Sequence, residues 1–117
     1  ARNPNPPTYD EHVSWMRKKL VDSNSYFYII EDRQDVGVIR LDPSTYSQLA
    51  LEVSIFIAPD FFGKGYASWA LNELRNKHPN ETLHAFVDEK NEASHRLFLK
   101  CHYKHNGEYY INEAISS

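Results

Sequence analysis

The chain has 117 residues, enough for one hydrophobic core, and we expect residues 1–117 to form a single domain. Its 41% hydrophobic and 25% charged residues are typical of a soluble globular protein, and the net charge of −3 argues against a nucleic-acid partner, because such surfaces normally carry a basic excess. Cys101 is the one cysteine, which excludes an internal disulfide and favours a reducing, cytoplasmic compartment. Since no apolar run reaches the length of a membrane span, no membrane partner is expected.

The chain opens with a proline-rich segment, Asn3–Pro7, that can be neither a helix nor a central strand. In the following stretch, "TYDEHVSWMRKKL", Thr8 and Glu11 fit a helix capping box. Apolar residues then recur at a helical spacing. They are Tyr9, Val13, Met16 and Leu20. This pattern predicts a helix over about residues 9–22.

Three β-branched and aromatic segments follow and predict strands. They are "SYFYIIE" (25–31), "VGVIRL" (36–41) and "LALEVSIFI" (49–57). The turn "DRQD" joins the first two, and the loop "DPSTYSQ" leads to the third. Strands joined in this order predict an antiparallel meander.

The stretch "APDFFGKGYASWALNEL" (58–74) carries two glycines and a lysine between a strand and a helix that extends to about Asn76. Such a junction leaves several backbone N–H groups pointing the same way at the positive end of a helix dipole. The sequence therefore predicts an anion site, above all for phosphate, at this loop.

The last third predicts a strand over "TLHAFVD" (82–88), a helix in "NEASHRLFLKC" and a hairpin at Asn106-Gly107. The overall order is typical of an α/β fold with a mixed sheet, in which a right-handed β-α-β crossover makes the strands near 50–57 and 82–88 parallel neighbours. Ligands bind beyond the carboxyl ends of such strands, and the glycine loop lies at that end.

The loop Phe62-Gly63-Lys64-Gly65-Tyr66-Ala67, together with the segment "NEASHRLFLKCHY" (91–103), resembles the GNAT superfamily of acyl-CoA-dependent N-acetyltransferases. The resemblance covers roughly residues 9–113. It implies a GNAT-like fold with acetyl-CoA as cosubstrate, a small-molecule amine as acceptor, no metal, and a monomer or homodimer. Because the family pattern usually begins one strand and one helix ahead of Thr8, we expect both elements either to be lacking here or to lie outside the sequence in view.

The resemblance also implies which residues contact the cofactor. The pantetheine would lie along the strand at Ile55, Phe56 and Ile57, with a backbone N–H near Ile57 as oxyanion donor. The remaining contacts are implied at Gly63, Lys64, Gly65, Tyr66, Ala67, Ser68, Asn91 and Phe98.

Two positions depart from the family motif. Phe62 stands where the family has Gln or Arg, so backbone amides would have to carry the pyrophosphate. Phe98 stands where the family often has a Tyr that protonates the leaving thiolate, and a phenyl ring cannot donate a proton. We expect the Phe98 ring to face the thioester sulfur.

Two residues are candidates for the general base that removes the proton from the amine. Glu52 lies in an apolar strand, where a carboxylate is costly unless it has a task or a partner, and it matches an acidic residue that many family members carry. His84, in the strand "TLHAFVD", is the alternative. Either could instead be an ordinary strand residue.

Three functions remain open at this point. The leading hypothesis is acetyl transfer to the amine of a sugar nucleotide, by direct transfer in a ternary complex. A protein N-terminal acetyltransferase and a non-catalytic acyl-CoA-binding or regulatory module are the alternatives. A metal site is not expected, because His102 and His105 lack two further ligands at a suitable spacing.

Overall fold

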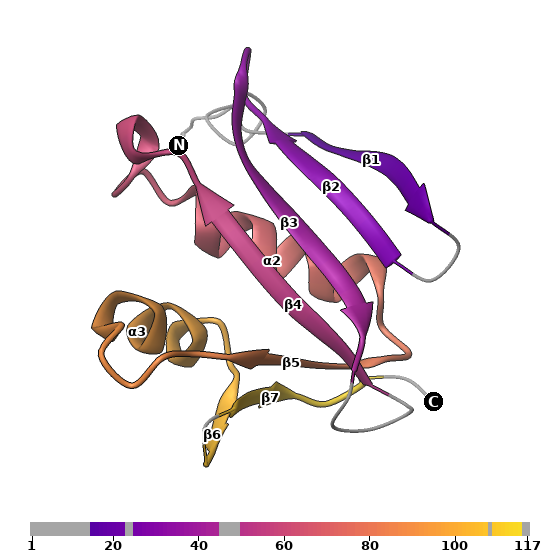
Figure 1. Ribbon diagram of the computed structural model, residues 1–117, viewed down its shortest axis with the longest axis vertical. Coiled ribbons are helices and arrows are strands. Elements are labelled where there is room, and N and C mark those ends of the chain that lie inside the picture. Colours follow the sequence, from indigo (N-terminus) through magenta and orange to yellow (C-terminus); the bar gives the residue numbers. More distant parts are fainter. Residues whose placement is uncertain (1–14, 23–24, 45–49, 108, 116–117) are drawn as a thin grey trace.

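The computed structural model describes residues 15–22, 25–44, 50–107 and 109–115, most of them arranged around a mixed seven-stranded sheet (Figure 1). The strands lie in the spatial order β1-β2-β3-β4-β5-β7-β6. They are β1 (Trp15–Asp22), β2 (Ser25–Glu31), β3 (Asp35–Pro43), β4 (Ala50–Ile57), β5 (Thr82–Phe86), β6 (Lys104–Asn106) and β7 (Tyr109–Asn112). A 3-10 turn (Pro59–Phe61) and two α-helices, α2 (Tyr66–Lys77) and α3 (Glu92–Lys100), complete the described elements.

The sheet confirms the predicted meander, crossover and hairpin. β2, β3 and β4 are antiparallel neighbours, and β4 and β5 are parallel with α2 as their connection. β6 and β7 pair antiparallel across the turn that contains Gly107. Gly107 has φ +64°, which explains why the Asn106-Gly107 sequence is a hairpin signal.

The helix predicted over about residues 9–22 is wrong from residue 15 onward. Trp15–Asp22 is a strand that pairs antiparallel with β2, while residues 9–14, Thr8 and the capping box lie outside the described residues. Without this pairing β2 would be an edge strand with unpaired backbone N–H and C=O groups. The hydrogen bonds formed with β2 outweigh the helix preference of this segment, because intrinsic helix propensity is weak. Met16 is still buried, although in a strand. The elements expected to be lacking ahead of Thr8 also fall outside the described part.

One hydrophobic core joins the sheet to both helices. It includes Ile39 of β3, Val53 of β4, Leu83 of β5, Leu74 of α2 and Phe98 of α3. Figure 1 shows α2 crossing behind β3 and β4. Within the described ranges, neither helix is long and apolar enough to cross a membrane.

The opposite face of the sheet, which we call the outer face, carries the polar residues of interest. Side chains alternate along a strand, so Glu52 and Phe56 of β4 and His84 and Phe86 of β5 point away from the core residues Val53 and Leu83. Phe56 and Phe86 are about half exposed on this face.

Candidate active site

β4 and β5 are paired only at the start of their shared length. The parallel register joins Ala50–Glu52 to Thr82–His84, whereas β4 runs on to Ile57 and β5 to Phe86. Figure 1 shows the two strands diverging from this base toward their carboxyl ends. From Glu52 to Ile57 the opening is about 17 Å long at the rise of an extended strand. The backbones of the two crossover strands therefore separate at the expected ligand position, and we call the region between them the wedge.

The backbone of β4 directs hydrogen-bonding groups into this wedge. The Ala58 N–H donates to the Val36 carbonyl at 2.9 Å, and the Ala50 carbonyl accepts from the Ser44 N–H at 3.2 Å, so the even-numbered residues of β4 bond toward β3. Because strand residues alternate, the N–H and C=O groups of Ile55 and Ile57 point toward β5. This is the orientation that an extended ligand or an oxyanion would need from these two residues.

The glycine loop stands at the open end of the wedge and leads directly into α2. Gly63 and Gly65 have φ +76° and +87°, and Gly65 is the N-cap of the helix. A Cβ at either position would meet no atom of the described part of the chain within 4 Å, so backbone conformation, rather than close packing against these residues, favours glycine here.

The start of α2 is suited to an anion. Its first backbone bond runs from Trp69 N–H to Gly65 C=O, so the N–H groups of Ala67 and Ser68 precede the intrahelical ladder. Among the described residues no side chain caps the helix, and its first turn, which is fully described, carries no acidic residue. The Tyr66 hydroxyl donates to the Asp32 carboxylate and ties the helix start to the β2–β3 turn. The geometry fits the phosphate site that the sequence predicts.

Glu52 and His84, proposed from the sequence as rival bases, are direct register partners at the base of the wedge. They share the outer face, and His84 is only 1% exposed whereas Glu52 is partly exposed. Burial lowers the pKa of His84, and the negative charge of Glu52 opposes part of that shift. Asp42 of β3 lies opposite Glu52 on its other side, so two carboxylates flank this point.

Ser44 is a neighbour that the sequence pattern did not indicate. It follows β3, and its hydroxyl is hydrogen-bonded to Nε2 of His84. In sequence it belongs to the loop "DPSTYSQ", where a serine is an ordinary turn residue and gives no chemical signal.

Two residues that the resemblance placed at the cofactor make contacts within the fold. The Asn91 side chain caps α3 by accepting the Ser94 N–H at 3.1 Å. Phe98 is 3% exposed and packs in the core, edge-on to Tyr103 at 4.9 Å and stacked with Tyr110 at 5.9 Å. This burial argues against a ring that faces the thioester, because the apolar face of α3 turns toward the sheet; the cofactor contact at Phe98 stays a prediction.

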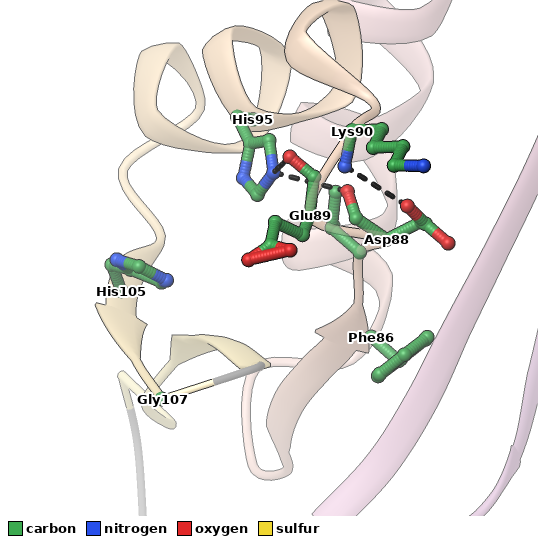
Figure 2. Close-up of a pocket in the computed structure, with 8 residues that line it drawn as sticks. Phe86, Asp88, Glu89, Lys90, His95, His105 and Gly107 are labelled. Atoms are coloured by element: carbon green, nitrogen blue, oxygen red, sulfur yellow. Dashed lines mark hydrogen bonds between the residues drawn. The ribbon is translucent and has the colours of Figure 1, made fainter.

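A pocket of about 720 Å³ lies beyond the end of β5, between α3 and the β6–β7 hairpin (Figure 2). His95 stands at its wall, with Nε2 at 3.1 Å and 3.2 Å from the carbonyl oxygens of Asp88 and Glu89 and Nδ1 at 2.6 Å from the Tyr110 hydroxyl. Two carbonyl acceptors require that Nε2 carry a proton. His95 therefore fixes the loop after β5, a role that the sequence analysis missed.

Among the described residues, no group of three or more His, Cys, Asp or Glu is arranged to hold a metal ion.

The family follows from comparison with known proteins. The model of the acetyltransferase (GNAT) domain matches residues 1–104. The chain belongs to this family. The resemblance in the sequence motifs and the GNAT-like fold are thereby confirmed.

Several relatives of this GNAT domain act on polyamines or proteins. Spermidine N(1)-acetyltransferase of Vibrio cholerae serotype O1 is 25% identical over 118 residues, covering 90% of this chain and 66% of that protein. A crystal structure of the spermidine N-acetyltransferase from Vibrio cholerae with CoA and spermine matches 80% of this chain and 62% of its own, with TM-score 0.66 and 25% identity. RimL, a ribosomal L7/L12 α-N-protein acetyltransferase in complex with coenzyme A, shares the fold at TM-score 0.69 and 16% identity, over 80% of this chain and 64% of its own.

The chain thus spans about two thirds of the length of the curated relative that it matches. The relatives named here act on spermidine or on a ribosomal protein, so they lend no support to a sugar nucleotide as acceptor.

Proposed function

We propose that this GNAT domain transfers an acetyl group from acetyl-CoA to a primary amine, directly and within a ternary complex. The observation that carries the proposal is the wedge between β4 and β5. The uncapped N-terminus of α2, a favourable place for an anion, lies at its open end, and Glu52 lies at its base. Its length of about 17 Å suits an extended pantetheine arm that places a pyrophosphate at one end and a thioester at the other.

The residues around the wedge supply what the reaction requires. N–H groups of the glycine loop and α2 bind the pyrophosphate, since Phe62 contributes no charge. The inward N–H of Ile55, which is nearer to Glu52 than that of Ile57, stabilises the oxyanion of the tetrahedral intermediate. Glu52 removes a proton from the amine, which attacks the thioester carbonyl only in its neutral form. When the intermediate collapses, the C–S bond breaks, and the thiolate of CoA leaves and takes a proton from solvent.

We propose a polyamine-like cation as the acceptor. Glu52 and Asp42 are register partners on the outer face, and Arg40 offsets Asp42 through an ion pair at 3.0 Å. Because Arg40 neutralises Asp42, the group of three keeps one net negative charge, that of Glu52, which attracts an ammonium group and repels the phosphates of a sugar nucleotide. The 25% identity to a spermidine N(1)-acetyltransferase supports the same choice.

Glu52→Gln tests the enzymatic proposal, because glutamine keeps the size of the side chain but accepts no proton. We expect kcat for spermidine to fall on the order of 10²-fold while the Kd for acetyl-CoA in calorimetry is unchanged. The acceptor screen includes spermidine, a sugar-nucleotide amine and a peptide with a free N-terminus, with release of free CoA as the readout.

Three outcomes would change the conclusion. A Glu52→Gln kcat within about twofold of wild type would remove Glu52 as the base. Preference for the nucleotide sugar or the peptide would overturn the polyamine assignment. Tight binding of acetyl-CoA with no turnover of any amine would favour a non-catalytic acyl-CoA-binding module on the same fold.

A further inference from the structure

Two carboxylates lie side by side on the outer face, and their surroundings differ. Asp42 and Glu52 are register partners across β3 and β4, which places their Cβ atoms about 5 Å apart. Asp42 is engaged, because its Oδ1 accepts the Ser25 hydroxyl at 2.6 Å and Nε of Arg40 lies 3.0 Å from its Oδ2. Within the part of the chain that the structure describes, the Glu52 carboxylate takes part in no hydrogen bond or ion pair. Of the two carboxylates, Glu52 is therefore the one available to a ligand.

The contacts of Asp42 hold a positive charge on this face. Arg40 precedes Asp42 by two residues in β3, so both side chains lie on the same side of the sheet, and Arg40 is level with Ser54 of β4. Nε of Arg40 also lies 3.1 Å from Oδ1, so it contacts both carboxylate oxygens. An arginine can only donate and an ionised carboxylate can only accept, so the direction of this interaction follows from the residue types. The charge of Arg40 is thus held at Asp42, next to the position of Glu52.

The charges at the base of the wedge can be counted for the described residues. Glu52 and Asp42 each contribute one negative charge, and Arg40 contributes one positive charge. On the β5 side of Glu52 lies His84, and burial lowers the pKa of His84, which favours its neutral form at pH 7. One net negative charge remains. Without Arg40 there would be two, and two like charges this close act together on any cation bound beside them.

We propose that Arg40 and Asp42 are specificity-determining residues for the acceptor amine. Arg40 keeps the Asp42 carboxylate occupied, so that the site offers one carboxylate, Glu52, to one ammonium group of the acceptor. The inference rests on the proposed function, because it takes Glu52 as the group that contacts the amine. It goes beyond that function in assigning Arg40 and Asp42 opposite effects on the affinity for the amine.

Calorimetry of spermidine binding to the full chain tests these opposite effects. CoA is present in place of acetyl-CoA, so no acetyl transfer can occur. Arg40→Gln exposes the charge of Asp42, and we expect the Kd for spermidine to fall about three- to tenfold at low ionic strength. Asp42→Asn leaves the charge of Arg40 unpaired beside Glu52, so the Kd should rise by a similar factor. The double variant has the wild-type net charge and should bind within about twofold of wild type. A purely structural role would weaken binding in both single variants.

Matched controls separate charge from shape. Arg40→Lys keeps the positive charge, so its Kd for spermidine should stay within about twofold of wild type. Arg96→Gln removes the same charge from another exposed ion pair, the one with Glu92 at 3.7 Å on α3, and should leave the Kd unchanged. In about 0.5 M salt the differences between the variants at Arg40 and Asp42 should shrink, because the ions screen charges over a few ångströms. The gain in Arg40→Gln should be larger for spermine than for propylamine, which carries less positive charge.

Turnover and binding separate the possible failures. If the wild type acetylates spermidine but both single variants shift its Kd in the same direction, the proposed function stands and the specificity assignment is overturned. If the wild type turns over no amine but the Kd values shift with the expected opposite signs, the proposed function fails and the charge assignment stands. A wild type that does not bind spermidine would overturn the inference. If Asp42→Asn does not fold, equal Kd values for Arg40→Gln and Arg40→Lys would overturn it instead.

Discussion

Tyr103→Phe should stabilise the fold, because the Tyr103 hydroxyl is buried without a hydrogen-bond partner among the described residues. The side chain is 4% exposed, and its ring lies edge-on to Phe98 at 4.9 Å. A buried hydroxyl that lacks a partner costs about 1–3 kcal/mol, whereas phenylalanine keeps the ring contacts. We expect the free energy of unfolding to rise by about 1 kcal/mol and Tm by about 4 °C.

Tyr110→Phe is the matched control, since it removes a hydroxyl from the same aromatic cluster. Tyr110 is 2% exposed, but its hydroxyl lies 2.6 Å from Nδ1 of His95. This variant should lose about 1 kcal/mol in urea unfolding at an unchanged m-value. If Tyr103→Phe also lost 1 kcal/mol or more, the Tyr103 hydroxyl would have a partner after all. An ordered water shared with Nε of Arg75, another buried polar atom without a described partner, would then be the natural explanation.

The pH dependence gives a second measurement on the same variant. Burial raises the pKa of Tyr103 above its ordinary value, with the positive charge of Arg75 opposing part of the shift. The unfolded chain therefore loses the phenol proton near pH 10 while the folded chain keeps it, and stability falls as the pH rises above 10. Wild type should lose up to about 1.4 kcal/mol per pH unit more than Tyr103→Phe in this range. Parallel pH curves for the two proteins would refute the reasoning.

Two further predictions concern the cofactor loop and α3. At Gly65, asparagine and aspartate face similar backbone strain at φ +87°, so Gly65→Asp should weaken CoA binding in calorimetry at least tenfold more than Gly65→Asn, through repulsion of about 1–4 kcal/mol. Equal affinities would contradict the pyrophosphate assignment. Phe98→Tyr should destabilise urea unfolding by about 1–2 kcal/mol, because the added hydroxyl enters the core. Unchanged stability with a raised kcat would show instead that the ring edge reaches the thioester.

Most of the fold could be predicted because the sequence pattern within each segment agrees with the strand pairing seen in the structure. "SYFYIIE" is β2 at its predicted bounds, and the glycine loop, the helix after it and the Asn106-Gly107 hairpin also lie where the sequence places them. The exception is Trp15–Asp22, where the apolar stripe suits a helix but the edge of β2 offers backbone partners. The periodicity of apolar residues predicts which side chains are buried, and Met16 is indeed buried. It does not predict which neighbouring element covers those side chains.

The candidate site was less predictable, because its parts come from three different strands or their ends. Glu52 and His84 each look like an isolated polar residue in an apolar strand, and only the parallel register makes them neighbours. Ser44 reaches His84 because β3 ends beside the start of β4. Phe98 aligns with a catalytic position of the family, yet its burial depends on Tyr103 and Tyr110, which the motif does not include.

In the proposed function the open end of the wedge binds CoA, and the closed end carries out the acetyl transfer. The loop at Gly65 is exposed, and in the proposed function its backbone binds the pyrophosphate whatever acyl group or acceptor is present, so changes there should act on the affinity for CoA. The closed end holds Glu52 and His84 about 17 Å away along β4, too far to contact a pyrophosphate in the loop. Changes at the closed end should therefore act on kcat with CoA affinity preserved. A chain in which both kinds of variant altered only CoA affinity would bind acyl-CoA through this wedge without using its closed end for chemistry.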